Sequence, residues 1–119
     1  RGTTTTAARW IVADGESGGP GEASTYVLVA NTSAQDQPVR FTLLTEGGQT
    51  HTAEGLVSAN GRYTIDVAGT FPQARNRRFS VLVESVSGTA PLVVERASYS
   101  STATVTWAAG TNSLALPLP

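Results

Sequence analysis

The chain has no cysteine and a single histidine, His51. The lack of cysteine excludes a disulfide framework, a thiolate metal site and a thiol nucleophile. A zinc site is disfavoured too, because such sites use several nitrogen or sulfur ligands. A serine nucleophile needs a base, but His51 lies in a Thr-His-Thr segment that we expect to be a strand, and no Gly-x-Ser-x-Gly motif is present. We therefore expect no enzymatic activity and interpret His51 as a surface or cross-strand residue.

Charge is also scarce. Charged residues make up 14% of the chain, against about 25% in a typical soluble domain. All eight basic residues are arginine, none is lysine, and the net charge is -1. Nucleic-acid binding needs a basic face that neutralises phosphates, so we expect no nucleic-acid partner. No apolar run approaches the roughly 20 residues of a membrane-spanning helix, so we expect no transmembrane segment.

The polar surface must therefore come from uncharged side chains, and the sequence contains 17 Thr and 11 Ser among its 119 residues. This length suits one domain with one core. A Thr-rich and Ser-rich surface with little charge is common in secreted β proteins. We expect the protein to be extracellular or attached to the cell surface.

The apolar residues recur with a period of two, which predicts strands rather than helices. Turn signals such as Gly47-Gly48 and Asn60-Gly61 separate the runs. The expected strands cover residues 8–13, 25–30, 39–45, 49–57, 62–67, 79–86, 92–99, 103–108 and 112–116. Residues 71–77 predict one helical turn at most. Eight or nine short strands predict an all-β, Ig-like antiparallel β-sandwich.

The organisation we expect is a leader over residues 1–7, followed by one sandwich domain over residues 8–119. The leader is either flexible or a donor strand that pairs with a neighbouring subunit through Thr3, Thr4, Thr5 and Thr6. Residues 15–23 contain four glycines and one proline, which predicts a mobile loop. Asp14, Glu16 and Glu22 of this region are candidate Ca²⁺ ligands, because Ca²⁺ takes several oxygen ligands. The alternative is a solvated loop without a cation, and we expect no other cofactor.

An ordered series of motifs runs through the chain. It consists of Trp-x-x-Ala-Asp-Gly from Trp10, Tyr-Val-Leu-Val-Ala-Asn from Tyr26, Ala-Asn-Gly-Arg-Tyr-Thr-Ile-Asp-Val from Ala59, Phe-Ser-Val-Leu-Val-Glu-Ser from Phe79, Val-Val-Glu-Arg-Ala-x-Tyr from Val93 and Trp-Ala-Ala-Gly-Thr-Asn from Trp107. This series resembles the C-terminal Ig-like β-sandwich modules of large exported bacterial proteins. The resemblance implies a non-enzymatic, extracellular role and no particular ligand. The chain departs from that pattern at Asp14, where the family more often has Glu.

Two sets of side chains are candidate ligand sites. Trp10 and Trp107 would stack on a sugar if their rings are exposed; the alternative is packing in the core or at a sheet edge. Arg75, Arg77 and Arg78 would bind an anionic glycan or a partner's carboxylate, because arginine offers a bidentate fork; the alternative is a solvated loop. Glu84, Glu95 and Arg96 lie within apolar strands, and we expect a structural ion pair of Arg96 with Glu84 or Asp66.

Three functions remain open from the sequence. The first is a non-catalytic extracellular structural or adhesion module of a larger secreted or surface protein, whose partners are other domains of that protein or like subunits. The second is a subunit of an extracellular filament assembled by β-strand complementation. The third is a carbohydrate-binding module whose partner is a polysaccharide.

Overall fold

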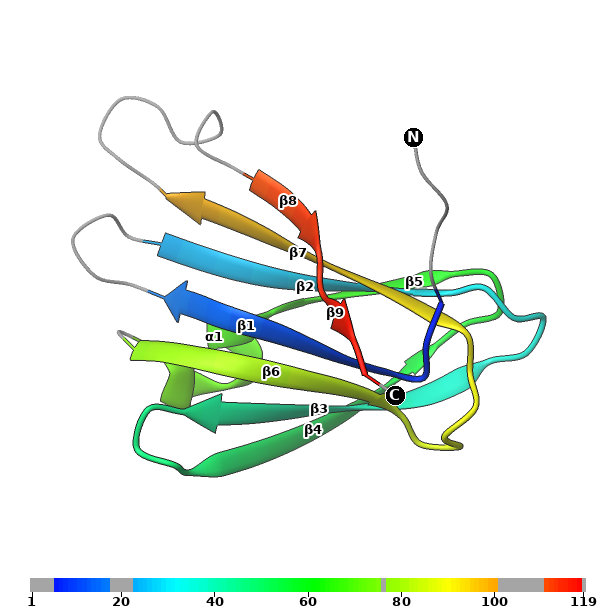
Figure 1. The fold of residues 1–119 in the computed structure, drawn as a ribbon, viewed down its shortest axis with the longest axis horizontal. Helices are drawn as coiled ribbons and strands as arrows, with labels where there is room; N and C mark the ends of the chain where they lie inside the picture. Colours follow the sequence, from blue (N-terminus) through cyan, green and yellow to red (C-terminus); the bar gives the residue numbers. More distant parts are fainter. Residues whose placement is uncertain (1–5, 18–22, 76, 101–110, 119) are drawn as a thin grey trace.

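A computed structural model describes residues 6–17, 23–75, 77–100 and 111–118. They form two antiparallel sheets that pack face to face, with strand orders β4-β3-β6-β1-β9 and β5-β2-β7-β8 (Figure 1). The strands are β1 (Arg9–Ser17), β2 (Ala23–Asn31), β3 (Gln37–Thr45), β4 (Thr50–Val57), β5 (Arg62–Asp66), β6 (Arg77–Ser85), β7 (Leu92–Ser100), β8 (Thr111–Leu114) and β9 (Leu116–Pro117). The predicted all-β antiparallel sandwich is confirmed.

The core lies between the two sheets and follows from the alternation of apolar residues. On β3 and β6, for example, every second residue from Val39 and from Phe79 is buried. The largest fully buried side chains include Trp10, Phe41 and Leu43. Successive side chains of a strand point to opposite faces, so the residues between these positions form the outer faces of the sandwich.

The turn between β3 and β4 is longer than Gly47-Gly48, the pair of residues that signals it in the sequence. Thr45 accepts a hydrogen bond from the backbone of Gly48 at 2.9 Å and donates one to the carbonyl of Gln49 at 3.0 Å. Gly48 has a φ of 82°, a left-handed conformation that costs glycine little. The loop therefore spans residues 46–48, and Gly48 supplies the conformation that a three-residue hairpin loop requires.

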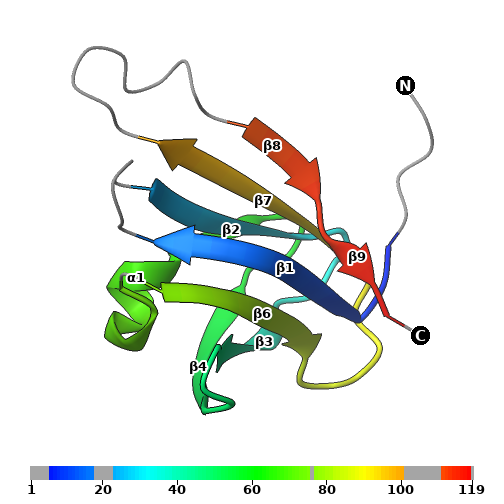
Figure 2. The same cartoon turned by 60° about the vertical axis from the view of Figure 1, so that its left-hand side comes forward.

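One end of the sandwich carries two short helical segments, α1 (Val67–Thr70) and η1 (Pro72–Ala74). Figure 2 shows α1 beside the start of β6. The sequence predicted a single turn over residues 71–77, so the first segment starts earlier than expected. Phe71, which lies between the two segments, and Ala74, the last residue of η1, are buried and hold this region against the core. No helix among the described residues has the length and apolar character needed to span a membrane.

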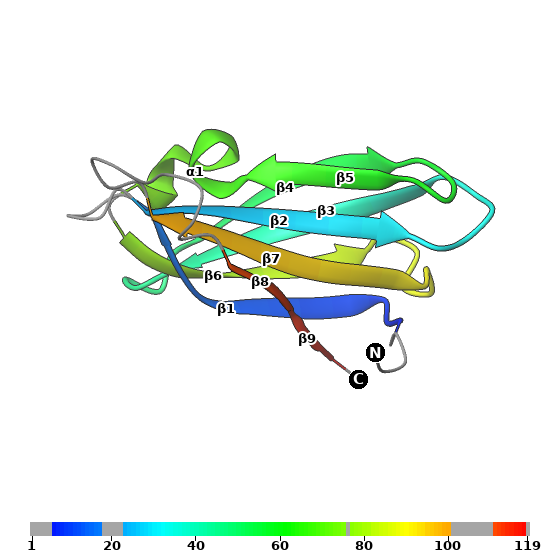
Figure 3. The ribbon, with the colours of Figure 1, turned by 90° about the horizontal axis from the view of Figure 1, so that it is seen from above.

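Both ends of the described chain connect the two sheets along the side where β8 and β9 lie (Figure 3). Ala7 exchanges backbone hydrogen bonds with Leu92 of β7 at 3.0 and 3.1 Å, and the chain then enters β1 of the other sheet. Near the C-terminus, β8 pairs with β7, whereas β9 pairs with β1. Between β8 and β9, the buried Ala115 donates a hydrogen bond to Val94 at 2.9 Å. The strand expected over residues 112–116 is therefore two short strands in different sheets; that expected over residues 103–108 lies outside the described residues.

The glycine-rich region after β1 also differs from expectation. Gly15, Glu16 and Ser17 belong to β1 and pair with Phe79, Arg78 and Arg77 of β6, after an irregularity between Val12 and Gly15. The mobile loop predicted over residues 15–23 is therefore wrong at both ends, because β2 begins at Ala23; residues 18–22 lie outside the described residues. A bulge there adds one residue to β1 relative to β6, and the pairing of the two strands continues beyond it.

Candidate functional site

The outer face of the four-stranded sheet is apolar at its centre. β2 and β7 are the two inner strands of this sheet, and each contains an uninterrupted apolar run. Val29 and Val94 point into the core and are completely buried, so Leu28, Ala30 and Val93 point outward, where all three are half-buried. Strands that are apolar on both faces are typical of sheets that are covered on both sides.

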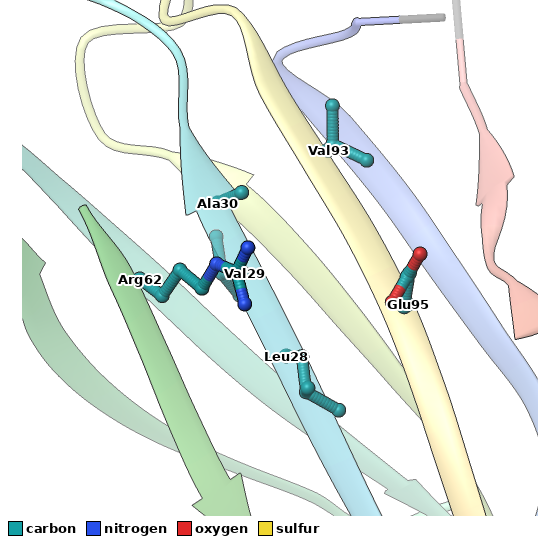
Figure 4. A pocket seen from close by; sticks show the side chains of 6 residues that line it. All are labelled: Leu28, Val29, Ala30, Arg62, Val93 and Glu95. Carbon is teal, nitrogen blue, oxygen red and sulfur yellow. The ribbon is translucent and has the colours of Figure 1, made fainter. Parts of the chain in front are cut away.

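A hollow of about 260 Å³ lies on this outer face. Its lining includes Leu28, Ala30 and Val93 together with Arg62 of β5 and Glu95 of β7; we call these five residues the sheet-face hollow. Ala30 is paired with Arg62 on one side and with Val93 on the other, and Leu28 is paired with Glu95. Figure 4 shows the Arg62 side chain lying over β2, with Glu95 on β7 beyond it. The small Ala30 therefore lies between a cation and an apolar wall.

Arg62 and Glu95 flank this hollow from opposite sides. Arg62 lies on β5 and Glu95 on β7, and β2 separates these two strands. The two residues are also offset along the strands, because Arg62 pairs with Ala30 of β2 whereas Glu95 pairs with Leu28. Among the described residues neither side chain belongs to an ion pair. Arg62 is exposed, and Glu95 is half-buried. The hollow thus presents one positive and one negative group whose charges are not matched within the described part of the chain.

The outer face of the five-stranded sheet is arranged differently. Arg9 and Glu84 form an ion pair at 3.4 Å, and Arg40 and Glu54 form another at 3.1 Å. The strand register places Glu84 opposite both Arg9 and Arg40, and Glu54 opposite Arg40. These four residues form a row of alternating charge across four strands, in which each charged group has an opposite neighbour.

The predicted ion pair of Arg96 with Glu84 is wrong, because Glu84 lies on the five-stranded sheet, where it pairs with Arg9, whereas Arg96 lies on the four-stranded sheet. The alternative partner, Asp66, belongs to the same sheet as Arg96, but its strand β5 is separated from β7 by β2. Arg96 donates a hydrogen bond from its guanidinium to the carbonyl of Ala13, across the gap between the sheets.

Trp10 is not a platform for a sugar. It is 1% exposed, and its indole nitrogen donates hydrogen bonds to the carbonyls of Ala7 at 3.0 Å and Leu92 at 3.2 Å. The prediction of Trp10 as a ligand-binding residue is wrong, because β1 turns this ring into the core. Trp107, the second candidate, lies outside the described residues.

The three arginines do not form one patch. Arg75 follows η1, while Arg77 and Arg78 begin β6, and all three are exposed. Adjacent residues of a strand point to opposite faces, so Arg77 and Arg78 diverge. A second hollow, of about 330 Å³, is lined by Arg78 together with Leu44 and Glu46, and the Glu46 carboxylate accepts a hydrogen bond from the Arg78 backbone at 3.3 Å. This carboxylate makes the surface beside Arg78 a poor site for an anion.

The remaining candidates stay predictions. Of the expected donor residues, Thr6 is exposed, and Thr3, Thr4 and Thr5 lie outside the described residues. Ala7, which we expected at the end of the leader, pairs within its own chain. For the candidate Ca²⁺ ligands, the backbones of Asp14 and Glu16 belong to β1, and Glu22 lies outside the described residues.

His51 lies on β4 opposite Leu43 of β3. It alternates with exposed neighbours and shares the inward face of β4 with the buried Val57. Its Nε2 atom is buried and has no hydrogen-bond partner in the described structure. The interpretation as a cross-strand residue is confirmed by the register, but the ring faces the interior rather than the surface.

The sheet-face hollow was not predicted from the sequence. Glu95 was expected only in a structural ion pair, and Arg62, Leu28 and Val93 were not candidate site residues. A signal was present in the residues 26–30 and 92–94, which are apolar without alternation. Such runs predict a strand with two apolar faces, and the outward face then needs a cover.

No protein-family model and no curated protein sequence matches the chain. Several solved structures share its fold, among them two that cover most of this chain. One is the crystal structure of protein 1070 of Thermotoga maritima, with a TM-score of 0.77 and 16% sequence identity over 95% of this chain and 96% of that chain. The other is the Anabaena sensory rhodopsin transducer, with a TM-score of 0.60 and 18% identity over 78% of this chain and 97% of that chain. At these identities the similarity establishes the fold alone.

Proposed function

We propose that this protein is a non-catalytic extracellular structural or adhesion module of a larger secreted or surface protein, and that it acts by binding protein through the outer face of its four-stranded sheet. The observation that carries this proposal is the sheet-face hollow. It combines outward apolar side chains on the two inner strands with two unmatched charges. The extracellular location rests on the Thr-rich and Ser-rich composition with few charges.

A protein partner fits this face better than a sugar or a nucleic acid. The walls Leu28 and Val93 are aliphatic, and no aromatic ring belongs to the lining that the structure describes, so these residues offer a sugar no stacking surface. One arginine beside one glutamate gives no net positive charge for phosphates. By contrast, a protein interface typically has an apolar centre and a polar rim. Aliphatic side chains flanked by one cation and one anion have this arrangement.

Photo-crosslinking in the organism that produces the protein tests the proposed face. A photoreactive amino acid replaces Thr64, an exposed residue paired with Leu28 on the same face. The matched control replaces Thr52, an exposed residue paired with Thr42 on the other sheet. We expect a protein adduct from position 64 and none from position 52. Equal adducts at both positions, or none at position 64, would refute the proposal.

A second candidate function, assembly by strand complementation, is favoured by the edge of β1. β9 pairs with only Trp10 and Ile11 of this strand, so the rest of the edge away from β6 has no paired strand among the described residues. Arg96 already donates to the carbonyl of Ala13, which occupies one acceptor that an added strand would use. We rank this function second for that reason. Deletion of residues 1–6, which removes all four candidate donor threonines and keeps the paired Ala7, tests it: unchanged oligomers would exclude it.

A further inference from the structure

The sheet-face hollow is complementary to itself. Its positive group, Arg62, and its negative group, Glu95, lie on opposite sides of β2, with Leu28 and Ala30 between them. A contact between identical surfaces requires that residue i meets residue j while j meets i. A cation and an anion on either side of an apolar centre satisfy this condition.

The geometry defines one arrangement. A two-fold axis that lies in the interface, perpendicular to the line from Arg62 to Glu95 and through its midpoint, exchanges the two positions. Each Arg62 then faces the Glu95 of the other copy. Because this line runs diagonally across the strands, the strands of the two sheets cross at a large angle, which is one of the two common arrangements of packed sheets.

We propose that the occupant of the sheet-face hollow is a second copy of this chain, bound face to face in a symmetric dimer through Arg62 and Glu95. The inference rests on the proposed function, because it uses the same face, and it adds the identity of the partner. Leu28, Ala30 and Val93 of one copy then face the same three residues of the other and lose their contact with water. Two ion pairs, each made of Arg62 from one copy and Glu95 from the other, close the rim.

Charge favours a second copy over an arbitrary apolar partner. Covering an arginine and a glutamate without opposite charges leaves both groups desolvated and unpaired, which is costly. A second copy supplies both opposite charges at once. The outer face of the five-stranded sheet offers no such match, because Arg9, Glu84, Arg40 and Glu54 already neutralise one another within the chain.

Charge reversal tests the dimer by sedimentation equilibrium on the full chain. We expect the natural protein to dimerise with rising concentration. Arg62→Glu and Glu95→Arg should each weaken the dimer by about tenfold or more, because each places like charges opposite each other. An equimolar mixture of the two single variants should recover dimers, since every contact in the mixed pair is again between opposite charges. The double variant should recover them for the same reason.

The control reverses charges on the other face. Arg40→Glu and Glu54→Arg should leave the dimer constant unchanged, and circular dichroism should show that all variants are folded. A natural protein that stays monomeric, or a mixture that fails to recover dimers lost in the single variants, would overturn this inference. If the chain is monomeric but position 64 crosslinks to a different protein, the dimer fails while the proposed function stands. If position 64 also gives no adduct, both fail.

Discussion

The indole nitrogen of Trp10 donates a hydrogen bond to the carbonyl of Leu92 at 3.2 Å, and this bond joins the two sheets of the sandwich. Leu92 also pairs with Ala7, so the first described residues, β1 and β7 meet at one point. Trp10 is also the largest fully buried side chain among the described residues. Trp10 thus has a structural role, in which it fixes the entry of the chain into the fold.

Substitution of Trp10 should destabilise the protein strongly. Trp10→Ala removes a buried aromatic side chain, and we expect the free energy of unfolding to fall by about 3–5 kcal/mol. Trp10→Phe keeps most of the volume but loses two hydrogen bonds, and a fall of about 1–2 kcal/mol follows. Urea unfolding monitored by circular dichroism measures both values. Stability unchanged by Trp10→Ala would contradict the buried position.

Asn31 should be a second structural anchor. It is 2% exposed, and its amide nitrogen donates to the carbonyls of Gln35 at 2.7 Å, Val57 at 3.1 Å and Ser58 at 3.2 Å. Asn31→Ala leaves these carbonyls without this donor, so we expect a loss of about 2 kcal/mol. Thr32→Ala is the control, because the hydroxyl of Thr32 makes an exposed hydrogen bond to Pro91; its effect should be the smaller of the two in the same urea titration.

Gly55 should not tolerate a side chain. A Cβ atom at this position would lie 2.6 Å from the ring of Tyr63, and that ring stacks on Phe41 with centroids 5.9 Å apart. Gly55→Ala must displace the stacked pair, and we expect it to cost about 1–3 kcal/mol. Gly47→Ala is the matched control, since nothing lies within 4 Å of its Cβ position. Equal melting temperatures of the two variants would refute the packing described for Tyr63.

Removal of the imidazole at position 51 should stabilise the protein. The Nε2 atom of His51 is buried without a hydrogen-bond partner in the described structure, and an unpaired buried polar atom is costly. We expect His51→Leu to raise the free energy of unfolding by about 1 kcal/mol. Thr50→Leu, a change at the exposed neighbouring position, should give no such gain. A lower melting temperature for His51→Leu would contradict the burial of this atom.

The sequence was a good guide to the strands because their signal is local. The alternation over residues 39–45 and 79–86 located β3 and β6 to within two residues at each end. Contacts between distant parts of the chain were not predictable in the same way. The pairing of Arg9 with Glu84, and the switch of the last strands from one sheet to the other, depend on the order of strands in each sheet.

The sheet-face hollow shows the same limit. The apolar runs of β2 and β7 indicate that both faces of these strands avoid water, and this part was readable from the sequence. That Arg62 and Glu95 flank the runs follows only from the placement of β5 beside β2 and β7 on its other side. The exposure of Trp10 was likewise undecided until the sheet order placed its ring between the sheets.

The central claim is that protein covers the outer face of the four-stranded sheet in an extracellular module. Introduced cysteines test it most directly, because the chain has none of its own. Thr64→Cys and Thr52→Cys each introduce one thiol, on the four-stranded and five-stranded sheet respectively, into a stretch of chain that has none of its own. Intact cells are treated with a maleimide that cannot cross membranes, and labelling is measured before and after extraction in denaturant. We predict that Thr52→Cys is labelled on intact cells, and that Thr64→Cys is protected until the protein is denatured. Equal labelling of both positions on intact cells would contradict the covered face, and no labelling of Thr52→Cys would contradict the extracellular location.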